Sequence, residues 1–162
     1  MTEETCTPRV RIEIRPANID DALDLAPRLR RDDKFEVMCS SGLNSVDALT
    51  QSIQFSEMCW TALLDDRPEI MWGVCKFPPD PSMGIVWLLS SEEMYRIPNR
   101  FWRESISYVS KMNEYFSTLF NYVHEGNTAS RKWLTKLGFE EKARVERYGV
   151  GKQPFILFAR TI

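Results

Sequence analysis

Hydrophobic and polar positions along the chain follow two periods, and the shorter period predicts the strands. Residues 10–14 alternate apolar and charged side chains, as in a strand with one buried face that ends before Pro16. The other strands are expected at residues 58–64, 70–77, 84–89 and 119–123, and near residues 141–148 and 154–161. The segment Asp-Asp-Arg-Pro-Glu, at 65–69, is rich in turn-forming residues, which predicts that the strands on either side form an antiparallel hairpin.

Apolar residues that recur every three or four positions predict the helices. Asn18 begins the first helix, whose apolar set continues through Leu29 with Pro27 as a late kink. Residues 98–117 carry so wide an apolar band that we expect this helix to be buried against the sheet. Shorter helices are expected at residues 33–39, stopping near Gly42, and from Asn44 or Ser45 to about Ser56.

The stretch from Asn127 to Phe139 carries the strongest local signals. Asn127 or Thr128 is expected to cap a helix, because a side-chain oxygen accepts from amides of the first turn that have no other partner. Gly138 predicts a left-handed end to that helix, and Phe139 is expected to pack back onto the last turn. With the apolar run at residues 119–123 before it, the segment reads as strand, capped helix, Gly-Phe, strand.

Composition and charge limit the class of protein. The chain has 162 residues, of which 43% are apolar and 27% charged, so we expect one globular domain over 1–162 with residues 1–9 as a flexible tail. A net charge of −2 offers no basic surplus for binding nucleic acid. No apolar run is long enough to span a bilayer, and the N-terminus has no apolar signal-peptide core, so the expected location is the cytoplasm.

Neither the cysteines nor the charged run at the end of the first helix is expected to form a functional site. Cys6, Cys39, Cys59 and Cys75 form no C-x-x-C pair and the single histidine lies far from them in sequence, so neither a metal site nor a disulfide is expected. The run of arginines and aspartates at residues 28–33 reads as a solvated helix end.

The order of elements, together with the Asn127 motif, resembles the GCN5-related N-acetyltransferases (GNATs). In that family the motif reads roughly N-x-x-A/S-x-x-x-Y-x-K-x-G-F. The matching positions here are Asn127, Ser130, Lys136, Gly138 and Phe139, whereas Leu134 replaces the tyrosine that often serves as the catalytic acid. The resemblance covers essentially the whole chain. It implies an α/β (α+β) fold with a mixed, mostly antiparallel central sheet of six to seven strands flanked by helices, acetyl-CoA as cofactor and a primary amine as substrate.

The loop that binds the coenzyme in GNATs is the part of this chain that departs from the family. Family members have a glycine-rich turn whose amides approach the pyrophosphate. Residues 90–101 contain no glycine, and Glu92 and Glu93 place negative charge where a polyanion would dock. Pro98 also removes one amide donor. Arg96 and Arg100 are the candidate replacements for phosphate contacts. We therefore expect a degenerate acetyl-CoA site.

Candidate site residues follow from the same resemblance. His124 ends the strand that borders the acetyl group in GNATs and is the candidate general base, with a solvated strand end as the alternative. Glu92 is the candidate proton relay and Tyr95 the candidate acid, each with a loop or packing role as the alternative. The candidate coenzyme-binding residues are Ser90, Ser91, Arg96, Asn99, Arg100, Asn127 and Ser130.

A narrower resemblance is to the GNAT-like internal virion, or internal core protein A, family of T7-like bacteriophages. It rests on an Arg-Pro-Ala start and on Trp-Leu and Ser-Ser in place of the coenzyme loop. Further matches are Leu119, Asn121 and Val123 in one strand and a closing pair, Phe155 and Phe158. This resemblance implies a phage-encoded protein that is made in the bacterial host cytoplasm and takes part in virion assembly.

Three hypotheses for function stay open from the sequence. The first is a phage protein with a degenerate coenzyme site that acts through contacts with phage structural proteins, in the host cytoplasm or the virion. The second is an active N-acyltransferase that moves an acetyl group from acetyl-CoA to a primary amine. The third is a host-directed binding or regulatory protein.

Overall fold

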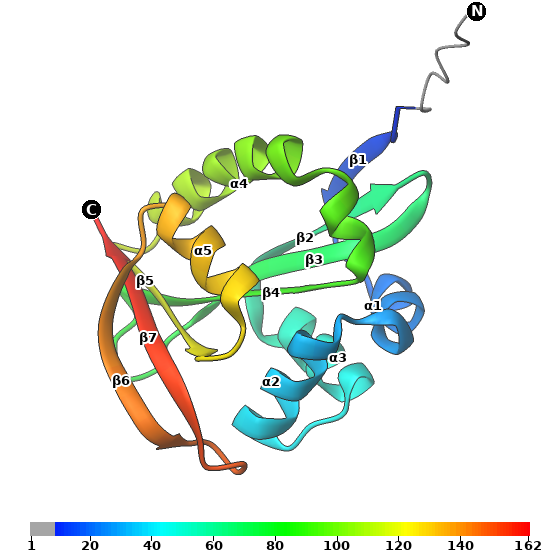
Figure 1. Cartoon of the computed structure of the whole chain (residues 1–162). Helices are drawn as coiled ribbons and strands as arrows, with labels where there is room; N and C mark the ends of the chain where they lie inside the picture. Colours follow the sequence, from blue (N-terminus) through cyan, green and yellow to red (C-terminus); the bar gives the residue numbers. More distant parts are fainter. Residues whose placement is uncertain (1–8) are drawn as a thin grey trace, which may run out of the picture.

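A seven-stranded sheet forms the centre of the molecule, in the order β1-β2-β3-β4-β5-β7-β6 (Figure 1). The computed structural model describes residues 9–162, so Cys6 and residues 1–8 of the expected tail lie outside the described residues. The strands are β1 (Ile12–Pro16), β2 (Ser56–Leu64), β3 (Arg67–Lys76), β4 (Met83–Ser90), β5 (Thr118–His124), β6 (Glu140–Tyr148) and β7 (Gln153–Thr161). All neighbouring strands are antiparallel except β4 and β5, which are parallel. The expected mixed, mostly antiparallel sheet is confirmed.

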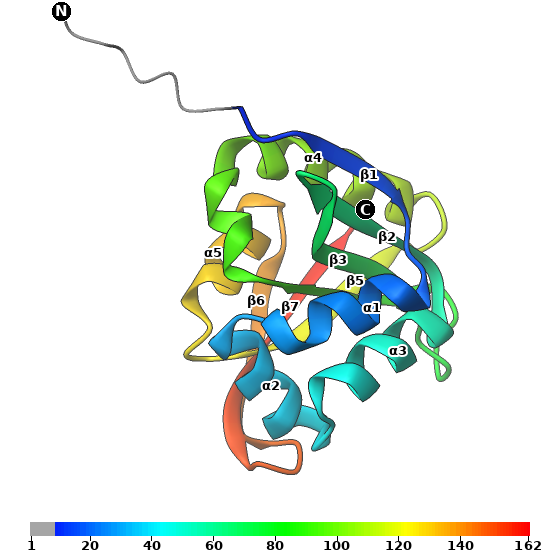
Figure 2. The ribbon, with the colours of Figure 1, turned by 90° about the vertical axis from the view of Figure 1, so that its right-hand side faces the viewer.

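Helices flank both faces of the sheet (Figures 1 and 2). They are α1 (Ile19–Leu25), η1 (Ala26–Arg28), α2 (Arg31–Ser41), α3 (Ser45–Phe55), η2 (Glu92–Arg96), α4 (Pro98–Asn113) and α5 (Thr128–Lys136). Side chains alternate along β3, so Ile70 and Trp72 join the core under α4 and α5, while Met71 joins a second core under α1 and α3.

The expected first helix ends earlier than predicted, and a 3₁₀ turn separates it from the next helix. α1 ends at Leu25, residues 26–28 form a 3₁₀ turn that contains Pro27, and α2 begins at Arg31. Pro27 removes an amide donor, and Leu29 is extended and pairs with Ser91 of the sheet. A contact distant in sequence, and not a kink, therefore ends the first helix.

Two other element ends differ from the sequence prediction. β1 includes Pro16, which a strand at the edge of a sheet tolerates because one side of it has no partner strand. α4 ends at Asn113, where the Asn113 side chain donates to the Phe116 carbonyl at 3.0 Å and shapes the turn into β5. Its buried side includes Phe101 and Val109, whereas Ile106 is 41% exposed.

The helix N-caps lie at positions that the sequence predicted. Asn44 caps α3 and Asn127 caps α5, so in each case the asparagine is the N-cap. Gly42 and Gly138 have φ angles of 73° and 85°, the left-handed backbone that glycine adopts without steric cost.

Candidate functional site

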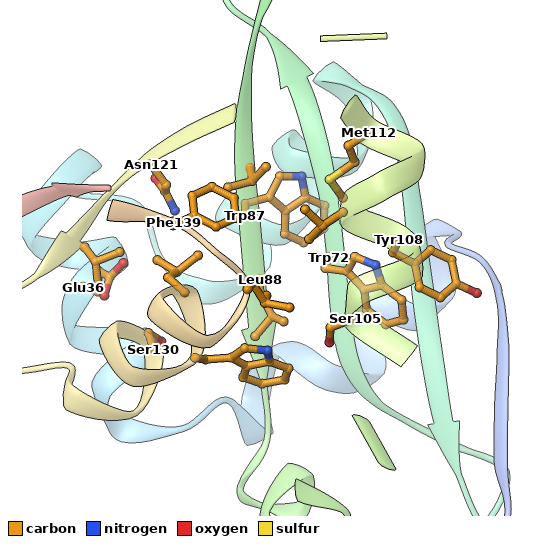
Figure 3. A pocket seen from close by; sticks show the side chains of 16 residues that line it. Glu36, Trp72, Trp87, Leu88, Ser105, Tyr108, Met112, Asn121, Ser130 and Phe139 are labelled. Atoms are coloured by element: carbon orange, nitrogen blue, oxygen red, sulfur yellow. The ribbon is translucent and has the colours of Figure 1, made fainter. Parts of the chain in front are cut away.

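The parallel strands β4 and β5 pair at their start and then separate. They pair at only three positions, from Met83 with Thr118 to Ile85 with Phe120. Beyond this point the gap contains a cavity of about 90 Å³ (Figure 3). Its walls come from β4 and β5, from α4 and α5 and, on the far side of the sheet, from Glu36 of α2.

Past the paired segment, the main chain of β4 faces this gap. The Ser91 N–H donates to the Glu69 carbonyl of β3 at 2.9 Å, so Ser91, one residue past the end of β4, continues the hydrogen-bonding pattern of the β3–β4 ladder. Because main-chain groups of an antiparallel strand alternate in direction, those of Ser90 and Leu88 point away from β3 toward the gap.

The chain itself occupies the end of this edge. The Arg30 N–H donates to the Ser90 carbonyl at 2.8 Å, and the Ser90 N–H donates to Oδ2 of Asp33 at 3.0 Å. Leu29 forms an isolated antiparallel bridge with Ser91. The start of α2 therefore lies against β4 much as a short extra strand would, and both main-chain groups of Ser90 are used.

Arg30 connects α2 to both sides of the gap. Its guanidinium donates to the Asp33 carboxylate at 3.1 and 2.6 Å, to the Tyr95 hydroxyl at 2.7 Å and to Oγ of Ser130 at 3.3 Å. Burial opposes the charge on Arg30, but the hydrogen bonds and charge of Asp33 outweigh burial and raise the Arg30 pKa. Arg30 and Asp33 are each 2% exposed, so the expectation of a solvated charged run is wrong for these two residues.

Asn127 and Glu36 extend the same polar cluster toward the cavity. Asn127 is 2% exposed, and its side-chain amide donates to Oε2 of Glu36 at 2.7 Å while its oxygen caps α5. Burial of the Glu36 carboxyl raises its pKa to about 7, with the like charge of Asp33 adding to the effect against the hydrogen bond from Asn127. Glu36 is thus a carboxyl group that titrates near neutrality at the wall of a cavity.

His124 lies at the end of β5, on the side of the strand opposite to the cavity. Asn121 and Val123 line the cavity, and alternation along the strand turns His124 to the other face. Its ring packs edge-on against Phe35 and Phe155 at centroid distances of 4.9 and 5.4 Å, and its Nδ1 accepts from the Gly126 N–H at 3.1 Å. A base role for His124 stays a prediction, and Glu36 is the carboxyl group among the residues that line the cavity.

The serines at the end of β4 are both buried and bonded within the protein. Oγ of Ser90 donates to the Met94 sulfur at 2.7 Å. Oγ of Ser91 donates to the Glu69 carboxylate and accepts from the Glu93 N–H at 3.1 Å, so it caps η2. Neither hydroxyl has its donor directed at the cavity.

The other candidate residues of the loop after β4 do not gather at one site. Arg96 pairs with Glu93 at 2.7 Å and with Asp65 at 3.3 Å, and Arg100 donates to the Val10 carbonyl at 3.3 Å. Both arginines are therefore bonded toward the β1 side of the molecule. Glu92 and Asn99 are exposed, and Tyr95, 50% exposed, holds its hydroxyl on Arg30. The structure brings together Ser90, Tyr95, Asn127 and Ser130 and leaves the others apart.

Trp133 of α5 lies between the cavity and a neighbouring one. It lines both the cavity in the gap and a second cavity of about 170 Å³ beside η2, α4 and α5. Its indole meets the Phe101 ring edge-on, with centroids 4.5 Å apart. The Trp133–Phe101 pair therefore lies between the cavity in the gap and the start of α4.

The described part of the chain has neither a metal-binding cluster nor a helix that could span a membrane. Residues 9–162 contain no cluster of three or more histidine, cysteine, aspartate or glutamate side chains placed to hold a metal ion. None of the helices in this range has the length and apolar character needed to cross a bilayer.

Comparison with solved structures shows the fold. A Bacillus subtilis acetyltransferase in complex with CoA aligns with a TM-score of 0.64 and 12% identity, over 95% of this chain and 99% of its own. The chain has the GNAT fold. An N-acetyltransferase from Staphylococcus aureus aligns at 0.66 and 12% identity, over 93% of this chain and 98% of its own.

A third structural neighbour is an acetyltransferase named for a ribosomal protein. The ribosomal-protein-S5-alanine acetyltransferase of Vibrio fischeri aligns with a TM-score of 0.64 and 14% identity, over 94% of this chain and 92% of its own. No protein-family model matches the sequence, and no curated protein matches it. Identities this low show the fold alone.

Sequence reasoning missed the residues of α2, and of the N-cap before it, that hold the site. Arg30, Asp33 and Glu36 are spaced three apart, which places them on one face of a helix, and that spacing was the available signal. The signal was hidden because the neighbouring Arg31 and Asp32 carry the same charges and are exposed. Only the contact with β4 distinguishes the two sets.

Proposed function

We propose that this chain is a bacteriophage GNAT-fold protein with a degenerate acetyl-CoA site, which acts in virion assembly through contacts with phage structural proteins. The observation that carries the proposal is that Arg30 and Asp33 form hydrogen bonds with both main-chain groups of Ser90. A ligand arm laid along the free edge of β4 needs these main-chain groups, and a buried ion pair already holds them.

The residues present do not fit acetyl-CoA. The loop after β4 contains no glycine, and two acidic residues stand in it. Arg96 and Arg100, the candidate phosphate contacts, are bonded elsewhere, and Trp133 with Phe101 lies between the cavity and the start of α4. The cavity of about 90 Å³ is also small beside the roughly 300–1,000 Å³ of ordinary ligand sites.

The thermal stability of the protein with coenzyme tests the closed site. A ligand that binds only the folded state raises the melting temperature in proportion to its concentration over Kd. We expect acetyl-CoA at millimolar concentration to leave the melting temperature unchanged. A rise of several degrees that saturates with ligand would contradict a degenerate site.

The assembly role draws its support from the narrower sequence resemblance, including Asn121 in β5 and the pair Phe155 and Phe158 in β7. A tagged copy produced in phage-infected cells tests it. We expect the chain to copurify with particles through a density gradient and to stay with them at moderate salt. Recovery only in particle-free fractions, at every stage of infection, would contradict the role.

One observation favours N-acyl transfer as the second candidate. The early separation of β4 and β5 leaves a gap with a cavity that contains Glu36, a carboxyl with a pKa of about 7. A group that titrates near neutrality meets the general requirement for a base toward an amine. Acetyl transfer to a primary amine, measured as release of free CoA thiol and lost in Glu36→Gln, would decide for this candidate.

A further inference from the structure

The second cavity, between the start of α4 and α5, has one apolar wall and one positive wall. Tyr95 of η2 and Phe101 and Trp102 of α4 contribute to the apolar wall. Lys132 and Lys136 of α5 lie on the other side, one helical turn apart. Among the described residues, these two lysines are the only charged ones that line the cavity. A ligand that fits both walls is therefore partly apolar and negatively charged.

Lys132 and Lys136 have no opposite charge within the described part of the chain. Both side chains are exposed, and no carboxylate of residues 9–162 forms an ion pair with either. Glu93 of η2 is already paired with Arg96 at 2.7 Å. The positive wall is thus open to a carboxylate from outside the described residues.

The chain that leads into β1 passes beside this cavity. The Arg100 guanidinium donates to the Val10 carbonyl at 3.3 Å, so Val10 lies beside the first turn of α4 (Figure 2). Pro98 and Trp102, two residues before and two residues after Arg100 in the same helix, both line the cavity. The segment that precedes Val10 therefore starts at the edge of the cavity.

The sequence of that segment has the complementary charge. Residues 1–8, MTEETCTP, contain Glu3 and Glu4 and neither lysine nor arginine. The seven residues that separate Glu3 from Val10 span up to about 25 Å when extended. The cavity begins within one helical turn of the arginine that Val10 contacts, so both carboxylates can reach the lysines of α5.

We propose that residues 1–8 of this chain dock in the second cavity, with the carboxylates of Glu3 and Glu4 on Lys132 and Lys136. The docked segment covers the aromatic wall and neutralises the positive one. The proposal goes beyond the assembly role and does not depend on it, because it assigns this surface to a segment of the chain itself. Another acidic partner gains access to the surface only by displacing the segment.

The covalent connection favours this segment over a free partner. Ion pairs between exposed side chains are weak one at a time, because water and salt screen them. A segment attached through a few residues, however, has an effective concentration in the millimolar range at the cavity. A free acidic peptide or a second copy of the chain lacks this advantage at micromolar concentration. The docking is therefore expected to be independent of protein concentration and sensitive to salt.

Charge reversal in the segment, read at the cavity by ¹H–¹⁵N spectra of the full chain at low salt, tests the proposal. The Trp102 indole N–H is the reporter, because Trp102 lines only the second cavity, and Trp72, which lines only the cavity in the gap, is the internal control. We expect the double variant Glu3→Lys with Glu4→Lys to shift the Trp102 signal and to leave the Trp72 signal in place. An unchanged Trp102 signal would overturn the proposal.

Heteronuclear ¹H–¹⁵N NOE values of the amides of residues 3–7 give the second readout. In the wild type at low salt we expect values near those of the folded domain. Reversal of both lysines of α5, Lys132→Glu with Lys136→Glu, is expected to lower them to the values of an unordered chain. Lys152→Glu changes an exposed, unpaired lysine in the turn after β6 and is the matched control, expected to leave them unchanged.

Two further conditions decide how the segment is held. Reversal of all four charges together is expected to restore the wild-type NOE values, and 1 M NaCl, with a Debye length of about 3 Å, is expected to lower them in the wild type. Low NOE values in the wild type at low salt, or values that the lysine reversal leaves unchanged, would overturn the proposal. Values that rise with protein concentration over a roughly tenfold range would assign the contact to a second copy and would also overturn it.

Discussion

The Ser90 N–H donates to Oδ2 of Asp33 at 3.0 Å, so a side chain of α2 holds the last residue of β4. The guanidinium of Arg30 in turn donates to Asp33, and the main-chain N–H of Arg30 donates to the Ser90 carbonyl. A main-chain edge that would otherwise be open to a ligand is thereby closed by the protein. The consequences can be tested at each member of this cluster.

Removal of the Asp33 charge is expected to destabilise the fold strongly. Asp33→Asn leaves the guanidinium of Arg30, which is 2% exposed, without its counter-charge, and breaking a buried pair on one side costs about 3–5 kcal/mol. Urea unfolding followed by tryptophan fluorescence measures the change.

The neighbouring Asp32 provides the matched control for Asp33. It lies on the same helix turn but is exposed, so Asp32→Asn is expected to change the free energy of unfolding by less than about 0.5 kcal/mol. If Asp33→Asn were as mild as Asp32→Asn, the buried pair would not be holding β4.

Loss of Asn127 is expected to weaken both the start of α5 and the environment of Glu36. Asn127→Ala removes the helix cap and the donor to Oε2 of Glu36, and we expect a loss of roughly 1–3 kcal/mol in the free energy of unfolding. Thr128→Ala, one residue later and exposed, is the control and should be close to neutral. A smaller loss in Asn127→Ala than in Thr128→Ala would show that Thr128 is the effective cap.

Glu36 is expected to make stability fall as the pH rises toward neutrality. Burial raises its pKa from 4.5 to about 7, so between these values the folded state binds more protons than the unfolded state. The stabilisation from the protonated carboxyl is fully present below about pH 4.5 and is lost as the pH rises through about 7. The effect is at most about 3 kcal/mol.

Glu36→Gln isolates this contribution from other titrating groups. The variant keeps a neutral side chain at all pH values, so we expect the difference in urea midpoint between pH 5 and pH 8 to be smaller in the variant than in the wild type. All other ionisable groups are common to both proteins, so their contributions cancel. A pH dependence that is the same in the two proteins would contradict a raised Glu36 pKa.

Trp133 is expected to keep the two cavities apart. Trp133→Ala deletes the edge-on contact with Phe101 and joins the two cavities, at a cost of roughly 2–4 kcal/mol. Trp102→Ala, which alters only the second cavity, is the comparison. Faster quenching of the remaining tryptophans by acrylamide in Trp133→Ala than in Trp102→Ala would support this separation, and equal quenching would contradict it.

Local signals in the sequence predicted the parts of the fold that local chemistry decides. The cap at Asn127 and the left-handed Gly138 depend on a few neighbouring residues, and the helix between them was placed to within a residue or two. Alternation and apolar runs likewise placed the seven strands.

Contacts between distant segments decided what the sequence did not reveal. Pro27 was visible as a break, but the extended Leu29 depends on its bridge to Ser91, more than sixty positions later. Arg30 and Asp33 carry the same charges as their exposed neighbours, and their burial follows from the position of β4. The absence of glycine from residues 90–101 could be read from the sequence. That Arg30 and Asp33 would bond to the main chain of Ser90 could not.

Isothermal titration of the purified protein with acetyl-CoA tests the central claim most directly. With Ser90 held by Asp33 and the loop arginines bonded elsewhere, we predict no heat of binding at millimolar coenzyme. Saturable binding in the micromolar range would contradict the account, because the coenzyme would then have displaced α2 from the edge of β4.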